Sequence, residues 1–140
     1  MDELASTLPE YEVVMNMFRV GHTFGPQLMA EIGDISRFNH RSALTAFAGV
    51  DPRVNQSGKM KIDSNRASKR GAPRLRKTLF QIMQTLMQNA PADNRVYLFM
   101  MKKKAEGKPY HVYMTAGANK FLRIYYGTVK AHLASQSQTE

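Results

Sequence analysis

The sequence predicts a mainly α-helical domain with one long basic loop, and three observations support this fold class. Apolar residues recur at three- and four-residue steps along most of the chain, which is the period of a helix face. Glycines and prolines interrupt this pattern at short intervals and therefore mark helix ends. Between Gly49 and Gly71 the helical period is lost, so this segment is predicted to be a surface loop or an irregular hairpin.

The first predicted element is a pair of helices joined by a glycine turn. Residues 20–26, VGHTFGP, contain Gly21, Gly25 and a proline, and a helix ending at Gly33 should follow them. This outline is like a helix-hairpin-helix, in which backbone N–H groups contact DNA phosphates, so Gly21 and Gly25 are candidate nucleic-acid contacts. An ordinary helix pair is the alternative. The first helix carries an apolar stripe of Leu4, Leu8, Tyr11, Val14, Met15 and Phe18.

Four further segments complete the prediction. Ser42 is expected to cap a short helix that ends at Ala48, and a longer helix should span residues 73–89. After the Ala-Pro-Ala break at residues 90–92, Asp93 is expected to cap a helix that reaches about residue 104. The last helix should carry the apolar residues between Met114 and Leu133. Residues 134–140 are polar and are predicted to be a disordered tail, so the domain should span residues 1–133.

Length and composition limit the class of protein. The 140 residues, 43% of them hydrophobic, are enough for one domain with its own core. The chain contains no cysteine, which excludes disulfides and thiolate metal sites. No run of 18 apolar residues occurs and the N-terminus is acidic, so neither a membrane span nor a signal peptide is expected. These features fit a cytoplasmic protein without a membrane partner.

The positive charge is concentrated between Arg53 and Lys77. This stretch has nine Lys/Arg residues and one acid, Asp63, so it carries a net charge of +8 out of +9 for the whole chain. A focused cationic field attracts a polyanion, and the phosphodiester backbone of nucleic acid is the commonest one. The candidate nucleic-acid-binding residues are Arg53, Lys59, Lys61, Arg66, Lys69, Arg70, Arg74, Arg76 and Lys77.

Ser57 and Gly58 lie inside this basic stretch. A serine hydroxyl in a cationic surrounding could attack a DNA phosphate, because phosphoryl transfer depends mainly on positioning and on stabilisation of the phosphate oxygens. Gly58 would allow a ligand to approach the backbone closely. The residues alone also allow a simple turn in a DNA-binding loop, and Ser64 and Ser68 compete for any role of a serine.

Other chemical motifs are missing from the sequence. His22, His40, His111 and His132 do not have metal-ligand spacing with acidic residues, and no HExxH, P-loop or dinucleotide glycine motif occurs. A tyrosine nucleophile at residues 125–126 is less favoured than core packing of that pair. We therefore expect neither a metal site nor a cofactor site within this chain.

Four runs of sequence resemble a known family in their order and spacing. They are GPQLMAEIGDISRF, ALTAFAGVDPRVNQSG, SKRGAPRLRKTLF and GKPYHVYMTAGANKFLRIYY, and the resemblance that they carry extends over roughly residues 18–133. The chain is similar to the C-terminal transposase domain of the bridge-RNA-guided insertion-sequence recombinases, which are relatives of the pilin-gene invertases. One departure is Arg19-Val20-Gly21, which stands where the family usually has Pro-Gly.

The resemblance implies DNA transposition by a serine mechanism. Ser57 aligns with the serine nucleophile of the family, which links covalently to a DNA 5′ phosphate, and the neighbouring Lys and Arg would hold DNA and a guide (bridge) RNA. Family members also carry an N-terminal RuvC-like domain, whose Asp-Glu-Asp-Asp carboxylates bind Mg²⁺ and complete the active site across subunits of a tetramer. Nothing in these 140 residues resembles that domain. The expectation is therefore a truncated reading frame or an excised domain, inactive alone, in the cytoplasm of a bacterium and associated with the nucleoid.

Two other functions compete with this one. A non-catalytic nucleic-acid-binding module would need the same positive charge but no hydroxyl at Ser57. A helical assembly domain would use the apolar stripe of the last helix as an interface.

Overall fold

The computed structural model describes residue 14 and residues 21–50 and 72–139, and every regular element within these ranges is helical. The predicted mainly α fold is therefore confirmed. In chain order the elements are α3 (Gly21–Ile32), the 3₁₀ helix η2 (Ile35–Arg37), α4 (Arg41–Ala48), α6 (Pro73–Asn89), α7 (Arg95–Ala105) and α8 (Tyr110–Thr139).

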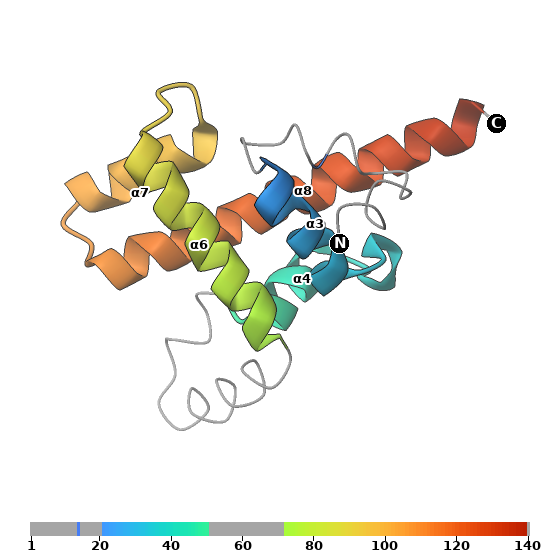
Figure 1. Ribbon diagram of the computed structural model, residues 1–140, viewed down its shortest axis with the longest axis horizontal. Coiled ribbons are helices and arrows are strands. Elements are labelled where there is room, and N and C mark those ends of the chain that lie inside the picture. The colour runs from blue at the N-terminus through green and yellow to red at the C-terminus, as the bar shows by residue number, and fades with distance from the viewer. Residues whose placement is uncertain (1–13, 15–20, 51–71, 140) are drawn as a thin grey trace.

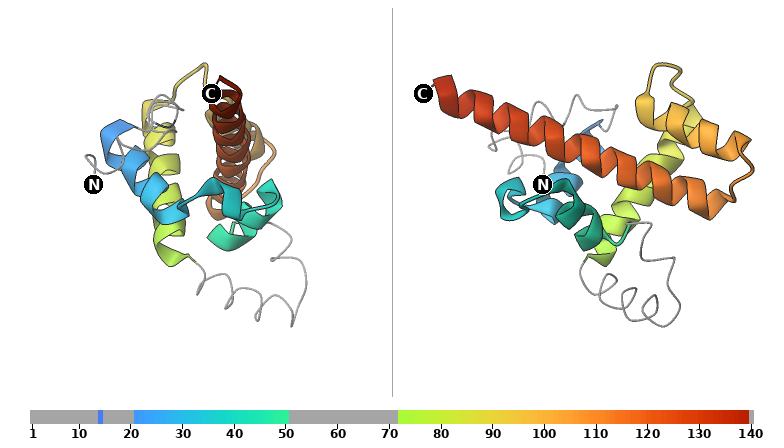
Figure 2. Two further views of the ribbon diagram at one scale, coloured as in Figure 1. Left: turned by 90° about the vertical axis from the view of Figure 1, so that its right-hand side faces the viewer. Right: turned by 180° about the vertical axis from the view of Figure 1, so that it is seen from behind.

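The longest helix, α8, organises the bundle (Figure 1). It contacts α4, α6, α7 and η2, whereas α3 packs mainly on α6. The helix α6 crosses α8, and α7 folds back along the first half of α8 to form a helical hairpin at one end of the molecule (Figures 1 and 2). The C-terminal part of α8 projects from the opposite end.

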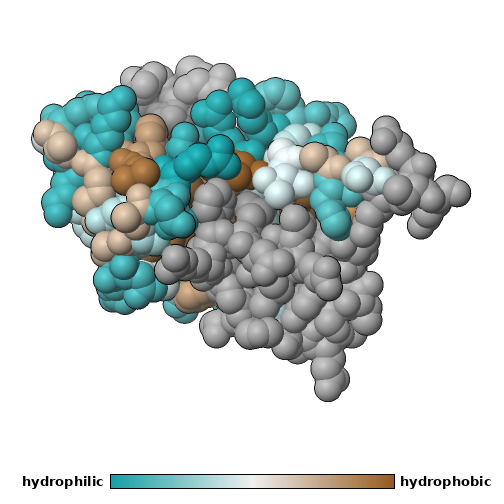
Figure 3. Space-filling view, turned by 90° about the horizontal axis from the view of Figure 1, so that it is seen from above, coloured by the Kyte–Doolittle hydropathy of each residue, from teal (hydrophilic) through white to brown (hydrophobic). Residues whose placement is uncertain are grey.

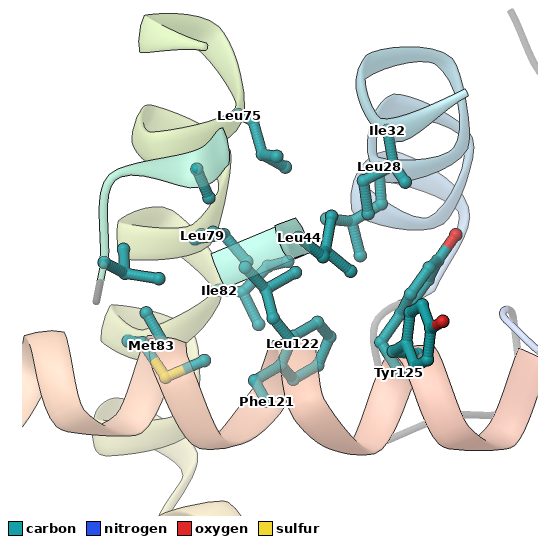
Figure 4. Close-up of a cluster of buried hydrophobic side chains, with 14 of the residues drawn as sticks. Leu28, Ile32, Leu44, Leu75, Leu79, Ile82, Met83, Phe121, Leu122 and Tyr125 are labelled. Atoms are coloured by element: carbon teal, nitrogen blue, oxygen red, sulfur yellow. The ribbon is translucent and has the colours of Figure 1, made fainter. Parts of the chain in front are cut away.

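The core lies where α3, α4, α6 and α8 meet (Figure 4). Each helix turns its apolar stripe inward, as a 3.6-residue period requires. Phe121 and Leu122 of α8 are fully buried, and Tyr125 is nearly so. The other labelled core side chains in Figure 4 are Leu28, Ile32, Leu44, Leu75, Leu79, Ile82 and Met83. Val14 is also fully buried, in agreement with its place in the predicted apolar stripe.

Short polar motifs fix the connections between helices. Gly33 and Gly49 adopt the left-handed conformation, with φ of 72° and 76°, and end α3 and α4. The carboxylate of Asp34 accepts two hydrogen bonds from Ser36, one from its backbone N–H and one from its hydroxyl. These bonds, the backbone one first, lower the pKa of Asp34. The guanidinium of Arg37 donates a hydrogen bond to the carbonyl of Ile32 at 2.6 Å. This bond provides a donor for a carbonyl group at the C-terminal end of α3.

The glycine turn predicted for residues 20–26 is wrong in the part that the structure describes. Residues 21–26 belong to α3, which contains both Gly25 and Pro26. Proline and glycine disfavour a helix interior, but tertiary packing overrides such local preferences. Both Gly25 and Pro26 are buried, and the turns that follow them place Leu28 and Ile32 in the core.

Two predicted caps were also wrong. The residue that caps α4 is His40, not Ser42. Its Nδ1 atom accepts a hydrogen bond from the backbone N–H of Ser42 at 3.2 Å. Asn94, not Asp93, caps α7 by accepting from the N–H groups of Val96 and Tyr97. Both differences arise because the cap is the residue whose backbone is extended, which composition does not specify.

The predicted bounds of α6 agree with the structure, whereas the predicted end of α8 does not. The helix predicted over residues 73–89 is confirmed, with Pro73 in its first turn. The disorder predicted for residues 134–140 is wrong as far as residue 139, because α8 continues to Thr139.

A glycine in α8 allows close contact with α7. A Cβ atom placed on Gly117 would lie 2.5 Å from the sulfur of Met100 and 3.1 Å from that of Met83, whereas one on Gly127 would meet nothing within 4 Å. We predict that Gly117→Val lowers stability by about 1–3 kcal/mol, because the added side chain overpacks the α7–α8 contact. Thermal unfolding followed by circular dichroism measures this effect.

The matched control is Gly127→Val, the same change in the same helix but in open space. Its stability should stay within about 0.5 kcal/mol of the wild type. Equal losses in both variants would show that the close approach at Gly117 is not the cause.

Candidate nucleic-acid interface

Most of the sequence-predicted site residues lie outside the described residues. They include the candidate nucleophile and most of the candidate phosphate contacts, whose roles stay predictions: Ser57, Gly58, Arg53, Lys59, Lys61, Arg66, Lys69 and Arg70. The structure does describe the residues on either side of the basic segment, defined here as residues 51–71.

Both flanks of the basic segment are fixed in the core. Val50, just before it, is 1% exposed and Ala72, just after it, is 7% exposed. The amide nitrogen of Asn119 in α8 donates to the carbonyl of Val50 at 3.1 Å. Arg76 in α6 donates to the carbonyl of Ala48 at 3.5 Å. The fold therefore determines the positions of the two residues that flank the basic segment, Val50 and Ala72.

The start of α6 carries positive charge next to Ala72, the residue that follows the basic segment. Arg74 and Lys77 are exposed, whereas Arg76 is half-buried and bonded to α4. The N-cap residue, Ala72, has no side-chain hydrogen bond to the first N–H groups, and no acidic residue occupies the first turn. Cations at a helix N-terminus oppose the helix dipole, so an anion bound here would be stabilised by both the side chains and the free N–H groups. Arg74 and Lys77 are therefore exposed cations beside the uncapped start of α6, and their contact with nucleic acid stays a prediction.

The structure does not support the same role for Gly25, whereas the role of Gly21, the first residue of α3, stays a prediction. Both lie within α3, and Gly25 is buried. Backbone N–H groups inside a helix bond to carbonyls of the preceding turn, so they are not free for phosphates. The predicted phosphate contact through a glycine turn is therefore wrong for Gly25, which the structure buries.

A second group of cations was missed from the sequence. The segment from Arg95 to Lys130 contains eight Lys/Arg residues and one acid, Glu106. Acidic residues elsewhere make the charge outside the first basic stretch nearly neutral in total, so net charge does not single this group out. The triple lysine at residues 102–104 was the signal that could have revealed it.

These cations gather around a cavity between α7 and α8, which we call the α7–α8 pocket. Its volume is about 560 Å³, and its lining includes Phe99, Lys103, Lys108, Asn119, Lys120 and Arg123. In Figure 3, hydrophilic residues surround a few hydrophobic ones at the left end of the molecule, where Figure 1 places the α7–α8 hairpin. Asn119 belongs both to this lining and to the contact with Val50, so the pocket adjoins the start of the basic segment.

The tyrosine pair at residues 125–126 is part of the core, and the preference for core packing over a tyrosine nucleophile is confirmed. Tyr125 is 2% exposed and Tyr126 is 9% exposed. The hydroxyl of Tyr126 donates to the carbonyl of Phe38 at 2.8 Å and accepts from the ammonium of Lys130 at 3.2 Å. A buried hydroxyl with these partners has a structural role.

Comparison with known proteins identifies the family. The family model of the Transposase IS116/IS110/IS902 family matches residues 11–98. The chain belongs to this family. No curated protein and no solved structure matches it.

Membership of this transposase family supports a role in transposition or recombination and implies interaction with DNA. The match includes the basic segment and the start of α6, so the family assignment covers the predicted serine and the cations at Arg74 and Lys77. It ends in α7, and all the residues that line the α7–α8 pocket follow it in the sequence.

Two searches of the described residues bear on other partners. No helix there is long and apolar enough to cross a membrane. No group of three or more His, Cys, Asp or Glu side chains in the same residues could hold a metal ion.

We predict that Arg74→Gln combined with Lys77→Gln weakens DNA binding by this transposase domain. Each neutralised phosphate contact should lower the slope of log affinity against log salt by about 1. Fluorescence anisotropy with labelled duplex DNA at several salt concentrations measures the slope, and unfolding should be unchanged because both side chains are exposed.

Arg74→Lys combined with Lys77→Arg keeps both charges and serves as the control, with a slope close to that of the wild type. A double Gln variant with an unchanged slope would remove the start of α6 from the interface.

Proposed function

We propose that this transposase-family chain supplies the nucleophile Ser57 and a basic nucleic-acid surface for DNA transposition. The observation that carries the proposal is the fixed position of both flanks of the basic segment, next to the exposed cations of α6. A loop held at both ends by a rigid bundle can present reactive groups from a defined place, and loops on rigid scaffolds commonly carry function.

The length of the chain limits how far Ser57 can lie from this surface. Ser57 follows Val50 by seven residues, so it lies at most about 25 Å from that buried anchor even if the chain is fully extended. The exposed side chains of Arg74 and Lys77 lie two and five residues beyond Ala72, the anchor on the other side. A DNA strand bound at the start of α6 is therefore within the range that Ser57 can reach.

The proposed reaction exchanges one phosphodiester bond for another. The Ser57 oxygen forms a bond to a DNA phosphorus atom while the bond from that phosphorus to the 3′ oxygen breaks. The serine proton leaves the nucleophile and a proton is gained by the 3′ oxygen, which gives a free 3′ hydroxyl and a 5′ phosphate linked to Ser57. Cations around the phosphate stabilise the charge that develops on its oxygens.

The remaining parts of the proposal follow from the resemblance. By that resemblance, Mg²⁺ would be held by the carboxylates of a RuvC-like domain. That domain, a guide RNA and self-association into a dimer or tetramer would complete the active site. The 140 residues alone should then bind nucleic acid without cleaving it, in the cytoplasm and close to the nucleoid.

We predict that Ser57→Ala abolishes the covalent protein–DNA adduct, because the methyl group that replaces the hydroxyl cannot form the bond to phosphorus. The chain is combined with a RuvC-like half, guide RNA, and donor and target DNA, and the adduct is detected by denaturing electrophoresis with radiolabelled DNA. Ser64→Ala and Ser68→Ala, which change neighbouring serines of the same segment, should keep the adduct.

Each contrary result has a specific meaning. Loss of the adduct in Ser64→Ala or Ser68→Ala, but not in Ser57→Ala, would assign the nucleophile to another serine. An adduct that survives all three changes would refute the serine mechanism and favour a non-catalytic nucleic-acid-binding module, in which DNA binding and its salt dependence are retained.

A further inference from the structure

The α7–α8 pocket combines positive charge with an aromatic wall. Four of its lining residues are cationic, namely Lys103, Lys108, Lys120 and Arg123, and none of the described residues that line it is acidic. The carboxylate of Glu106, which does not line the pocket, lies 3.8 Å from the ammonium of Lys103. Cations that are brought together in this way repel each other. An anion that binds among them reduces this repulsion and so stabilises the folded protein.

Phe99 is the centre of this arrangement. The ammonium groups of Lys103 and Lys120 lie 5.4 and 4.9 Å from the centroid of its ring. One cation comes from α7 and the other from α8, so the helical hairpin directs both toward the same aromatic side chain. The ring stabilises the cations in part and also provides an apolar surface, half-buried in the pocket, for a planar group.

A hollow with these components suits a single strand better than a duplex. In a duplex the bases are stacked inside and the phosphates form the outer surface, so only the cations at the pocket rim could be used. A single strand can place its phosphates against Lys and Arg and turn a base or sugar into the hollow, where aromatic side chains stack on bases. The volume of about 560 Å³ lies within the range of pockets that enclose small organic groups.

We propose that the α7–α8 pocket is a second nucleic-acid site, which binds a phosphate and the adjoining base or sugar of a single-stranded polynucleotide. Lys108, Lys120 and Arg123 contact the phosphate, and Phe99 forms the wall for the base. Asn119 joins the pocket to Val50, so the bound strand runs toward the start of the basic segment. This site needs no hydroxyl at Ser57 and is separate from the proposed catalytic step.

The test compares two double variants that lose the same charge from the same hairpin. Lys108→Gln with Arg123→Gln removes two exposed cations that line the pocket. Lys102→Gln with Lys104→Gln removes two exposed cations that do not line it. The complete chain is titrated into labelled single-stranded RNA, single-stranded DNA of the same sequence, and duplex DNA, and affinity is measured by fluorescence anisotropy.

We expect the pocket variant to bind single strands at least tenfold more weakly than the wild type, and the control variant to lose less than threefold. Affinity for the duplex should fall by a similar small factor in both variants. The RNA and DNA arms show which single strand the pocket prefers. Phe99→Leu should weaken single-strand binding at least fivefold while leaving the salt slope unchanged, because it removes stacking and no charge.

Three results would overturn the proposal. Equal losses in the two double variants would show that only net charge matters. Unchanged single-strand affinity in the pocket variant would exclude the pocket. Displacement of the oligonucleotide by polyglutamate as effectively as by unlabelled oligonucleotide would indicate an acidic protein partner instead. A failed adduct experiment with Ser57→Ala would not affect any of these outcomes, because binding is measured without catalysis.

Discussion

Burial of one face of α8 is the constraint on which the rest of the structure depends. Phe121, Leu122 and Tyr125 on this helix are nearly or fully buried, and α4, α6, α7 and η2 all pack against it. Aromatic and leucine side chains of this size contribute much of the apolar burial that stabilises a small domain. Because the same helix also supplies Asn119, the packing that stabilises the fold also positions the start of the basic segment.

The positive charge of the molecule, unlike its apolar core, does not stabilise the fold. Cations lie at the uncapped start of α6, and four others line the α7–α8 pocket, where Lys103 forms an ion pair of 3.8 Å with Glu106. An exposed pair of that kind contributes little to folding. The apolar core must therefore tolerate this repulsion in the free protein, and a bound polyanion removes it. A surface of this type is better explained by ligand binding than by folding.

The sequence predicted the helical class and the bounds of α6, because proline at the first position and the Ala-Pro-Ala break are strong local signals. It failed at α3, where equally strong local signals, Gly25 and Pro26, were overridden by burial of Leu28 and Ile32. It failed by one or two residues at the caps of α4 and α7, because residue type does not determine which residue has the extended backbone of a cap, here His40 and Asn94.

The α7–α8 pocket could not be predicted in this way, since it is created by tertiary contact. Phe99 and Lys103 lie in α7, and Lys120 and Arg123 lie in α8, so no local pattern joins them. They come together because Gly117 lacks a side chain and allows α8 to approach Met100 of α7 closely. The triple lysine indicated positive charge but not a cavity. A close helix crossing thus converts separate solvated cations into a site with a defined shape.

The positions of the two cationic sites follow from the same anchors. Val50 is held by Asn119, which lines the α7–α8 pocket, and Ala48 is held by Arg76, which belongs to the same turn of α6 as Arg74 and Lys77. Both ends of the basic segment are therefore tied to helices that present cations to solvent. Under the two proposals, a polynucleotide bound at either site would pass close to a flank of the segment that carries Ser57. The contacts that fix the flanks of the segment therefore also fix the cations beside them, which is the arrangement that the two proposed sites require.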